Sequence, residues 1–147
     1  VRILMSWMPG AGHLIAVLAF ARAFAQAGDE VLVAVREPGI GMVRAAGFEA
    51  WPLDGAASPA RDAVFARARR LAFDQANALV VREIFGPFDG RAALPGIRAA
   101  IGAWHRDVVV IDITECAAPI AARWGTRSTP PTWARCRPAS TSSPGCR

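Results

Sequence analysis

The feature that most constrains the fold is a regular alternation of short apolar runs with longer amphipathic ones. The apolar runs lie at residues 1–6 (VRILMS), 30–35 (EVLVAV), 48–53 (FEAWPL) and 107–112 (DVVVID). Each has the length and the aliphatic content of a β-strand, and the last holds four consecutive aliphatic residues, which indicates a strand buried on both faces. Strands that alternate with helices predict an α/β fold: a doubly wound, mostly parallel sheet covered by helices on both sides.

Helices are expected between and after these strands, at about residues 12–27, 39–46, 91–104 and 114–124. The first has apolar residues at three- and four-residue spacing and is followed by Gly28, a helix-ending residue. Thr114 is expected to cap the last. A longer helix is predicted at residues 59–86, with the sequence FGPFDG at residues 85–90 as its end.

The topology of such a sheet indicates where a ligand binds. The chain order reverses between the first strand and the strand that begins the second half, so strands one and four lie side by side. Ligands bind at the carboxyl ends of the strands at this point. Two segments follow those ends: residues 8–13 (MPGAGH), and Asp112 with residues 113–115 (ITE).

The glycine-rich turn after the first strand has two interpretations, of which dinucleotide binding is the weaker. A dinucleotide fingerprint requires the pattern G-x-G-x-x-G. Gly10 and Gly12 supply the first two glycines, but Ile15 stands in the third place. Glu37, after the second strand, is the candidate ribose-binding acid. A P-loop is excluded because the chain contains no Lys. A Rossmann-type dinucleotide-binding oxidoreductase stays open as the alternative.

The other interpretation makes His13 a general base. At the first turn of a helix, unpaired amide groups and the helix dipole disfavour the imidazolium and keep the ring able to accept a proton. Asp112 follows the neighbouring strand, where a carboxylate can orient the ring and stabilise its charged form. The bland interpretation is that His13 and Asp112 only cap or pack at the ends of their elements. His105 is expected to be a surface residue.

Composition limits the partners. The formal net charge is +5, but four of the 17 Arg residues lie in residues 125–147, which leaves 13 Arg against 12 acidic residues in residues 1–124. We therefore expect no nucleic-acid partner.

No apolar run reaches the roughly 18 residues of a membrane span and no signal peptide is visible, so a cytoplasmic protein is expected. The cysteines lack metal-binding spacing, and neither a metal nor a cofactor is expected.

Four motifs together resemble those of one enzyme family. They are MPGAGHL at residues 8–14, ARAFAQAGDEVLVA at 21–34, VRAAGFE at 43–49 and DVVVIDITECAAPIAA at 107–122. They resemble the amino-terminal, acceptor-binding domain of GT-B glycosyltransferases of the UGT-like (UDP-glycosyltransferase-like) family, above all actinobacterial enzymes that act on macrolides and other natural products. The resemblance covers residues 1–124 and is least clear in residues 54–90, which fits the variable acceptor-binding region of that family.

The resemblance implies a hexosyltransferase reaction. A sugar would pass from a nucleotide-diphosphate sugar, a co-substrate, to a hydroxyl group of an apolar natural-product acceptor. His13 would deprotonate the acceptor hydroxyl, and Asp112 would support it. The residues expected to contact the acceptor are Met8, Gly12, Phe73, Phe85, Phe88 and Glu115. For each of the three phenylalanines taken singly, plain core packing is the competing interpretation.

The family's donor site lies in a carboxyl-terminal domain without a counterpart in this sequence, so the chain alone is expected to be inactive. Residues 125–147 contain no Val, Ile, Leu, Phe or Met and four each of Arg, Pro, Ser and Thr, which predicts a disordered tail outside the domain at residues 1–124. When the codons implied by residues 125–147 are read in a neighbouring frame, they encode more aliphatic residues than the given frame does. Our hypothesis is therefore that a frameshift has replaced the rest of the domain, which would leave the sheet incomplete. A non-catalytic truncated or accessory protein is a third possibility.

Overall fold

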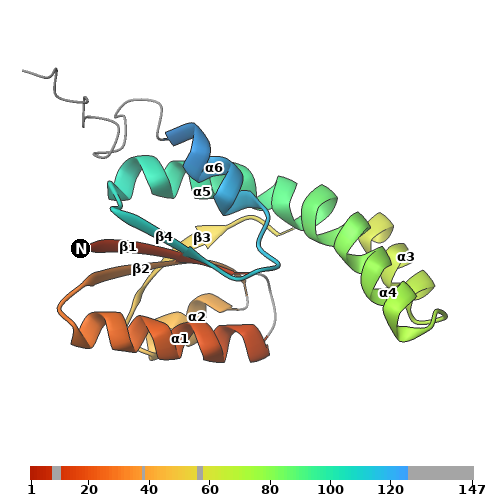
Figure 1. Cartoon of the computed structure of the whole chain (residues 1–147), viewed down its shortest axis with the longest axis horizontal. Helices are drawn as coiled ribbons and strands as arrows, with labels where there is room; N and C mark the ends of the chain where they lie inside the picture. Colours follow the sequence, from red (N-terminus) through yellow and green to blue (C-terminus); the bar gives the residue numbers. More distant parts are fainter. Residues whose placement is uncertain (8–10, 38, 56–57, 126–147) are drawn as a thin grey trace, which may run out of the picture.

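The computed structural model describes residues 1–7, 11–37, 39–55 and 58–125 (Figure 1). The strands are β1 (Arg2–Ser6), β2 (Glu30–Arg36), β3 (Glu49–Leu53) and β4 (Val108–Ile111). The helices are α1 (Ala11–Gln26), α2 (Gly39–Ala45), α3 (Pro59–Ala68), α4 (Phe73–Val80), η1 (Val81–Gly90), α5 (Arg91–Trp104) and α6 (Ala117–Gly125). Met8 and the predicted tail beyond residue 125 lie outside the described residues.

The four strands form one parallel sheet in the order β3-β2-β1-β4. In its register, Ser6 at the end of β1 lies opposite Ala34 of β2 and Ile111 of β4. The predicted α/β class, the parallel sheet and the adjacency of the first and fourth strands are confirmed. The predicted burial of the fourth strand on both faces is wrong: Val108 and Ile111 are 44% and 41% exposed, because β4 is the edge strand of the described sheet.

Helices cover both faces of the sheet, as the sequence predicts. Figure 1 shows α1 and α2 on one side and α5 and α6 on the other. On the first side, Leu14 and Leu18 of α1 are buried in one cluster with Val33 of β2. On the second side, Ile97 of α5 and Ala118 of α6 are buried in a cluster with strand residues. None of the described helices is long and apolar enough to cross a membrane.

The helical insertion between β3 and α5 differs from the prediction. The expected single helix at residues 59–86 is divided into α3 and α4 by a turn at residues 69–72, which lets Val64 of α3 and Leu79 of α4 be buried in one cluster with Ile84 of η1. The expected end at residues 85–90 is also wrong, because the chain passes Pro87 in the π-helical segment η1 and continues into α5. Proline lacks the amide donor of a regular α-helix, and the wider π-helical turn accommodates it.

Two glycines of α2 differ in the space around them and form a matched pair. A Cβ atom built on Gly39 would lie 2.5 Å from Cγ2 of Val35, a stiff and buried side chain of β2, whereas one on Gly41 would meet no atom within 4 Å. We expect Gly39→Ala to lower the free energy of unfolding by about 1–3 kcal/mol through overpacking. Gly41→Ala should leave it unchanged or raise it by up to about 1 kcal/mol, because alanine favours a helix. Urea denaturation measures both, and equal effects would contradict the tight approach of α2 to β2.

Candidate active site

His13 and Asp112, predicted from opposite ends of the sequence, meet at the carboxyl ends of β1 and β4. His13 lies in the first turn of α1, and Asp112 directly follows β4. The Nδ1 atom of His13 lies 2.5 Å from Oδ2 of Asp112. The imidazole is half exposed, whereas the carboxylate is only 14% exposed. Because Nδ1 donates to the carboxylate, Nε2 is the ring nitrogen left to accept a proton.

The two oxygens of the Asp112 carboxylate have different partners. While Oδ2 faces His13, Oδ1 accepts hydrogen bonds from the backbone amide of Thr114 at 2.7 Å and from its Oγ1 hydroxyl at 2.6 Å. Partial burial by itself would raise the pKa of Asp112, but the hydrogen bonds from Thr114 and His13 outweigh it and hold that pKa below its ordinary value. The carboxylate is therefore ionised at neutral pH and able to stabilise an imidazolium.

A cavity of about 400 Å³ opens beside this pair. Its lining residues are Met5, Ser6, His13, Ala16, Val17, Phe20, Phe24, Val110, Ile111 and Asp112. Apart from Ser6, His13 and Asp112, the wall is apolar, and Phe20 of α1 is 62% exposed. The arrangement can hold an apolar molecule with a hydroxyl group beside a base, which is suited to removing a proton from that hydroxyl.

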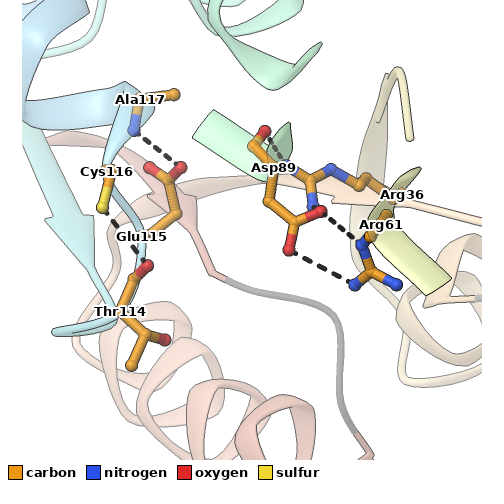
Figure 2. A network of polar contacts seen from close by, with 7 residues as sticks. All are labelled: Arg36, Arg61, Asp89, Thr114, Glu115, Cys116 and Ala117. Atoms are coloured by element: carbon orange, nitrogen blue, oxygen red, sulfur yellow. Dashed lines mark hydrogen bonds and ion pairs between the residues drawn. The ribbon is translucent and has the colours of Figure 1, made fainter. Parts of the chain in front are cut away.

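Glu115 has a different environment from the one expected of an acceptor contact. The residue is 3% exposed, and its carboxylate accepts a hydrogen bond from the amide of Ala117 at 2.9 Å (Figure 2). It accepts a second one from the amide of Ala118 at 2.7 Å. These are the first amides of α6, which a carboxylate stabilises. The prediction that Thr114 caps this helix is therefore wrong, because Glu115 supplies the cap and the Thr114 hydroxyl is bonded to Asp112.

The other expected acceptor contacts do not line the cavity beside His13. Phe73 is 77% exposed at the start of α4, and Phe85 and Phe88 pack against the buried cluster of the helical insertion. Gly12 lies in α1 beside His13. The aromatic residues that do line the cavity are Phe20 and Phe24 of α1. Their spacing in the sequence is typical of core residues of a helix, so the sequence alone does not indicate that they line a cavity.

A buried ionic cluster, which the sequence interpretation missed, lies at the end of β2 (Figure 2). Arg36 and Asp89 are 6% and 1% exposed. The Arg36 guanidinium donates to the backbone carbonyl of Asp89, and Arg61 forms two hydrogen bonds to the Asp89 carboxylate at 3.2 and 3.3 Å. Burial lowers the pKa of Arg36, and the charges of Asp89 and Glu115 oppose this effect. The cluster ties the helical insertion to the carboxyl edge of the sheet.

A second, larger hollow of about 560 Å³ lies on the hairpin of α3 and α4. It is lined by Arg67, Arg70, Leu71, Gln75, Ala78, Leu79 and Arg82, and it has neither a histidine nor a carboxylate in its wall. The smaller cavity at His13 is therefore the better candidate for chemistry. Across the described part of the chain, no three His, Cys, Asp or Glu side chains are placed to hold a metal ion.

The chain is similar to known transferases. No family model matches it. The L-demethylnoviosyl transferase of Streptomyces niveus is 32% identical over 130 residues, which cover 82% of this chain and 31% of that protein. The glycosyltransferase VinC in complex with dTDP has a similar fold, with a TM-score of 0.63 at 23% identity over 84% of this chain and 32% of that one. The spinosyn rhamnosyltransferase SpnG complexed with thymidine diphosphate gives a TM-score of 0.61 at 22% identity, over 85% and 31% of the two chains.

The chain is similar in sequence to the transferase of Streptomyces niveus and similar in fold to the glycosyltransferases VinC and SpnG. The resemblance carried by the four sequence motifs is thereby confirmed. This chain spans about a third of the length of the proteins it matches. The solved structures therefore show the fold that this chain shares, while the reaction of those longer enzymes is a proposal for this chain.

The lowered pKa of Asp112 predicts a contribution to stability that acid removes. With a lower pKa in the folded than in the unfolded state, the carboxylate stabilises the fold fully above its unfolded pKa of about 3.9, and this stabilisation is lost as the pH falls through the folded pKa. Between about pH 5 and about pH 3, Asp112→Asn should therefore lose less stability than the wild type. Urea denaturation across this range measures the difference. Asp54→Asn, at an exposed position, is the control, and an unchanged pH slope in Asp112→Asn would contradict the hydrogen bonds at Asp112.

The buried cluster predicts a large cost for removing the charge of Asp89. In Asp89→Asn, the guanidinium groups of Arg36 and Arg61 would lack their carboxylate, and breaking a buried ion pair from one side costs about 3–5 kcal/mol. Urea denaturation measures the change in the free energy of unfolding. Asp74→Asn, in the exposed first turn of α4, is the matched control and should change it by less than about 0.5 kcal/mol. A similarly small change in Asp89→Asn would count against a structural role for the cluster.

Proposed function

We propose that this chain is the acceptor-binding part of a glycosyltransferase in which His13 is the general base and Asp112 its supporting carboxylate. The observation that carries the proposal is the contact of 2.5 Å between Nδ1 of His13 and Oδ2 of Asp112 at a largely apolar cavity. A histidine that only packs in the core would have a buried ring, whereas the ring of His13 is half exposed and lines the cavity. The pair combines a proton acceptor, a group that orients it and space for a reactant.

In the proposed reaction, the acceptor lies in the cavity with its hydroxyl group at Nε2 of His13. The hydroxyl proton moves to Nε2 while the acceptor oxygen attacks the anomeric carbon of the sugar. The bond from that carbon to the nucleotide diphosphate breaks, and the diphosphate leaves with the bonding electrons. Asp112 accepts the Nδ1–H hydrogen bond throughout and stabilises the imidazolium that forms. Direct displacement of this kind inverts the configuration at the anomeric carbon.

The chemistry of the site and the compounds named for similar proteins suggest the substrate classes. The cavity wall, with Phe20, Phe24 and Val110, suits an apolar natural-product aglycone. VinC and SpnG were each solved with thymidine diphosphate, and SpnG also with the spinosyn aglycone. We therefore propose a thymidine-diphosphate sugar as donor. In this proposal, the described residues form the acceptor side of the site and bind the aglycone.

The role of His13 is tested in a chimera that joins residues 1–124 to the carboxyl-terminal part of the Streptomyces niveus transferase. Replacement of the base, His13→Ala, should lower the turnover number by about two to four orders of magnitude, the usual cost of losing a general base. Initial rates of sugar transfer give this ratio. His105→Asn, at the only other histidine of the chain, is the matched control and should retain the rate, because asparagine tolerates the left-handed backbone at this position. A near-normal rate in His13→Ala would return His13 to a structural role.

A further inference from the structure

The turn after β4 contains a hydrogen-bond arrangement that goes beyond a pair of catalytic residues. Both donors of Thr114, its amide and its hydroxyl, point at the same oxygen of Asp112, at 2.7 and 2.6 Å. The other oxygen is thereby left to His13. We propose that Thr114 is a positioning residue, whose hydroxyl holds the plane of the Asp112 carboxylate so that one oxygen points at Nδ1 of His13, which fixes the tautomer of the imidazole. This inference rests on the proposed function of the same site.

The physical need for such a group follows from the freedom of a carboxylate to rotate. The terminal torsion of an aspartate has a broad and roughly two-fold energy profile, and only an orientation that directs an oxygen at Nδ1 keeps the hydrogen bond to His13. A single amide donor leaves this torsion loosely defined, whereas two donors on one oxygen hold it from two directions. Asp112 then presents Oδ2 to His13 in one orientation, and Nδ1 carries the proton. Nε2 is kept as the base.

The position of Thr114 is in turn held by the start of α6. The amide of Glu115 donates to the backbone carbonyl of Asp112 at 3.0 Å, which closes the turn. The carboxylate of Glu115 is bonded to the first amides of α6, and Sγ of Cys116 donates to the carbonyl of Thr114 at 3.7 Å (Figure 2). Ile113, between the two bonded residues, is 97% exposed, so its side chain does not hold the turn by packing. The hydrogen bonds of the turn connect the start of α6 to Asp112.

A purely local role of Thr114 makes a different prediction. If its hydroxyl only stabilised the turn, its loss would lower stability without changing which nitrogen of His13 is protonated. The imidazole tautomer therefore separates the two roles. The nitrogen chemical shifts of a histidine report this tautomer through its carbon-bound protons, so the exposed Nδ1 proton itself need not be observed.

The experiment uses the whole chain labelled with ¹⁵N-histidine. The chain has two histidines, and His105→Asn leaves His13 alone; asparagine tolerates the left-handed backbone at this position, where φ is 49°. In this background, at a pH where the ring is neutral, we expect His13 to carry its proton mainly on Nδ1. Asp112→Ala gives the fraction of Nδ1–H tautomer that is expected when the hydrogen bond between His13 and Asp112 is lost. Thr114→Val, which has nearly the same shape without the hydroxyl, should move the fraction of Nδ1–H tautomer at least half way to that value.

Thr114→Ser keeps the hydroxyl and should retain the wild-type fraction. Ser58→Ala removes a hydroxyl from the start of α3, where it accepts from the amide of Arg61, and is the matched control without effect. If Thr114→Val does not fold, Thr114→Ala provides the same test with a smaller side chain. The proposal is overturned if a folded Thr114→Val or Thr114→Ala keeps the wild-type fraction, or if Thr114→Ser loses it.

The same measurement keeps this inference distinct from the proposed function. A wild-type chain without preference for Nδ1–H would overturn both, since the pairing with Asp112 itself would then be missing. A tautomer that depends on Thr114, together with full activity of His13→Ala in the chimera, would support the positioning and contradict only the general base. A tautomer independent of Thr114, with activity lost in His13→Ala, would overturn only the positioning.

Discussion

The parallel pairing of β1 with β4 is the interaction on which the candidate site depends. Ser6 lies opposite Ile111 at the ends of the two strands, and the amide of Asp112 donates to the carbonyl of Ser6 at 3.2 Å, so the pairing extends to the residue that faces His13. His13 follows β1 in the first turn of α1. Two side chains 99 positions apart in the sequence are thereby placed on adjacent strand ends. A slip of this pairing by one residue would turn Asp112 to the other face of the sheet and remove its partner.

This placement could be predicted from the sequence because it follows from rules of topology. Four aliphatic runs separated by helical segments specify a parallel sheet, and the reversal of chain order puts the first and fourth strands together. The errors concern features that such patterns do not contain. Pro87 predicts the end of a helix, yet in the structure it lies within the π-helical segment η1. The sequence predicts Thr114 as an N-cap, yet its hydroxyl donates to Asp112, and Glu115 accepts from the first amides of α6.

The buried ionic cluster could not be predicted from the sequence for a related reason. Arg36 ends an apolar strand and Asp89 lies in the helical insertion, 53 positions later, and neither residue stands out in its own segment. Only the packing of the insertion on the sheet brings them together, and the ion pairs of Asp89 with Arg36 and Arg61 offset part of the cost of burying these charges. The acceptor contacts show the same limit, because Phe20 and Phe24 have the spacing of core residues and Phe73 has the surroundings of a surface residue. Local pattern predicts an element, but which of its side chains face a cavity depends on neighbours elsewhere in the chain.

The site combines a fixed base with an adaptable wall. Hydrogen bonds of the turn hold Asp112, and both Asp112 and Glu115 are tied to backbone groups of regular elements. The cavity wall, by contrast, is formed largely by side chains of α1 and the edge strand, among them the exposed Phe20 and Ile111. Exposed apolar side chains can be exchanged at little cost to the fold, whereas each polar group of the turn has a specific partner that its loss would leave unpaired. Under the proposed function, such a scaffold can vary the shape of the cavity wall while the position of His13 stays the same.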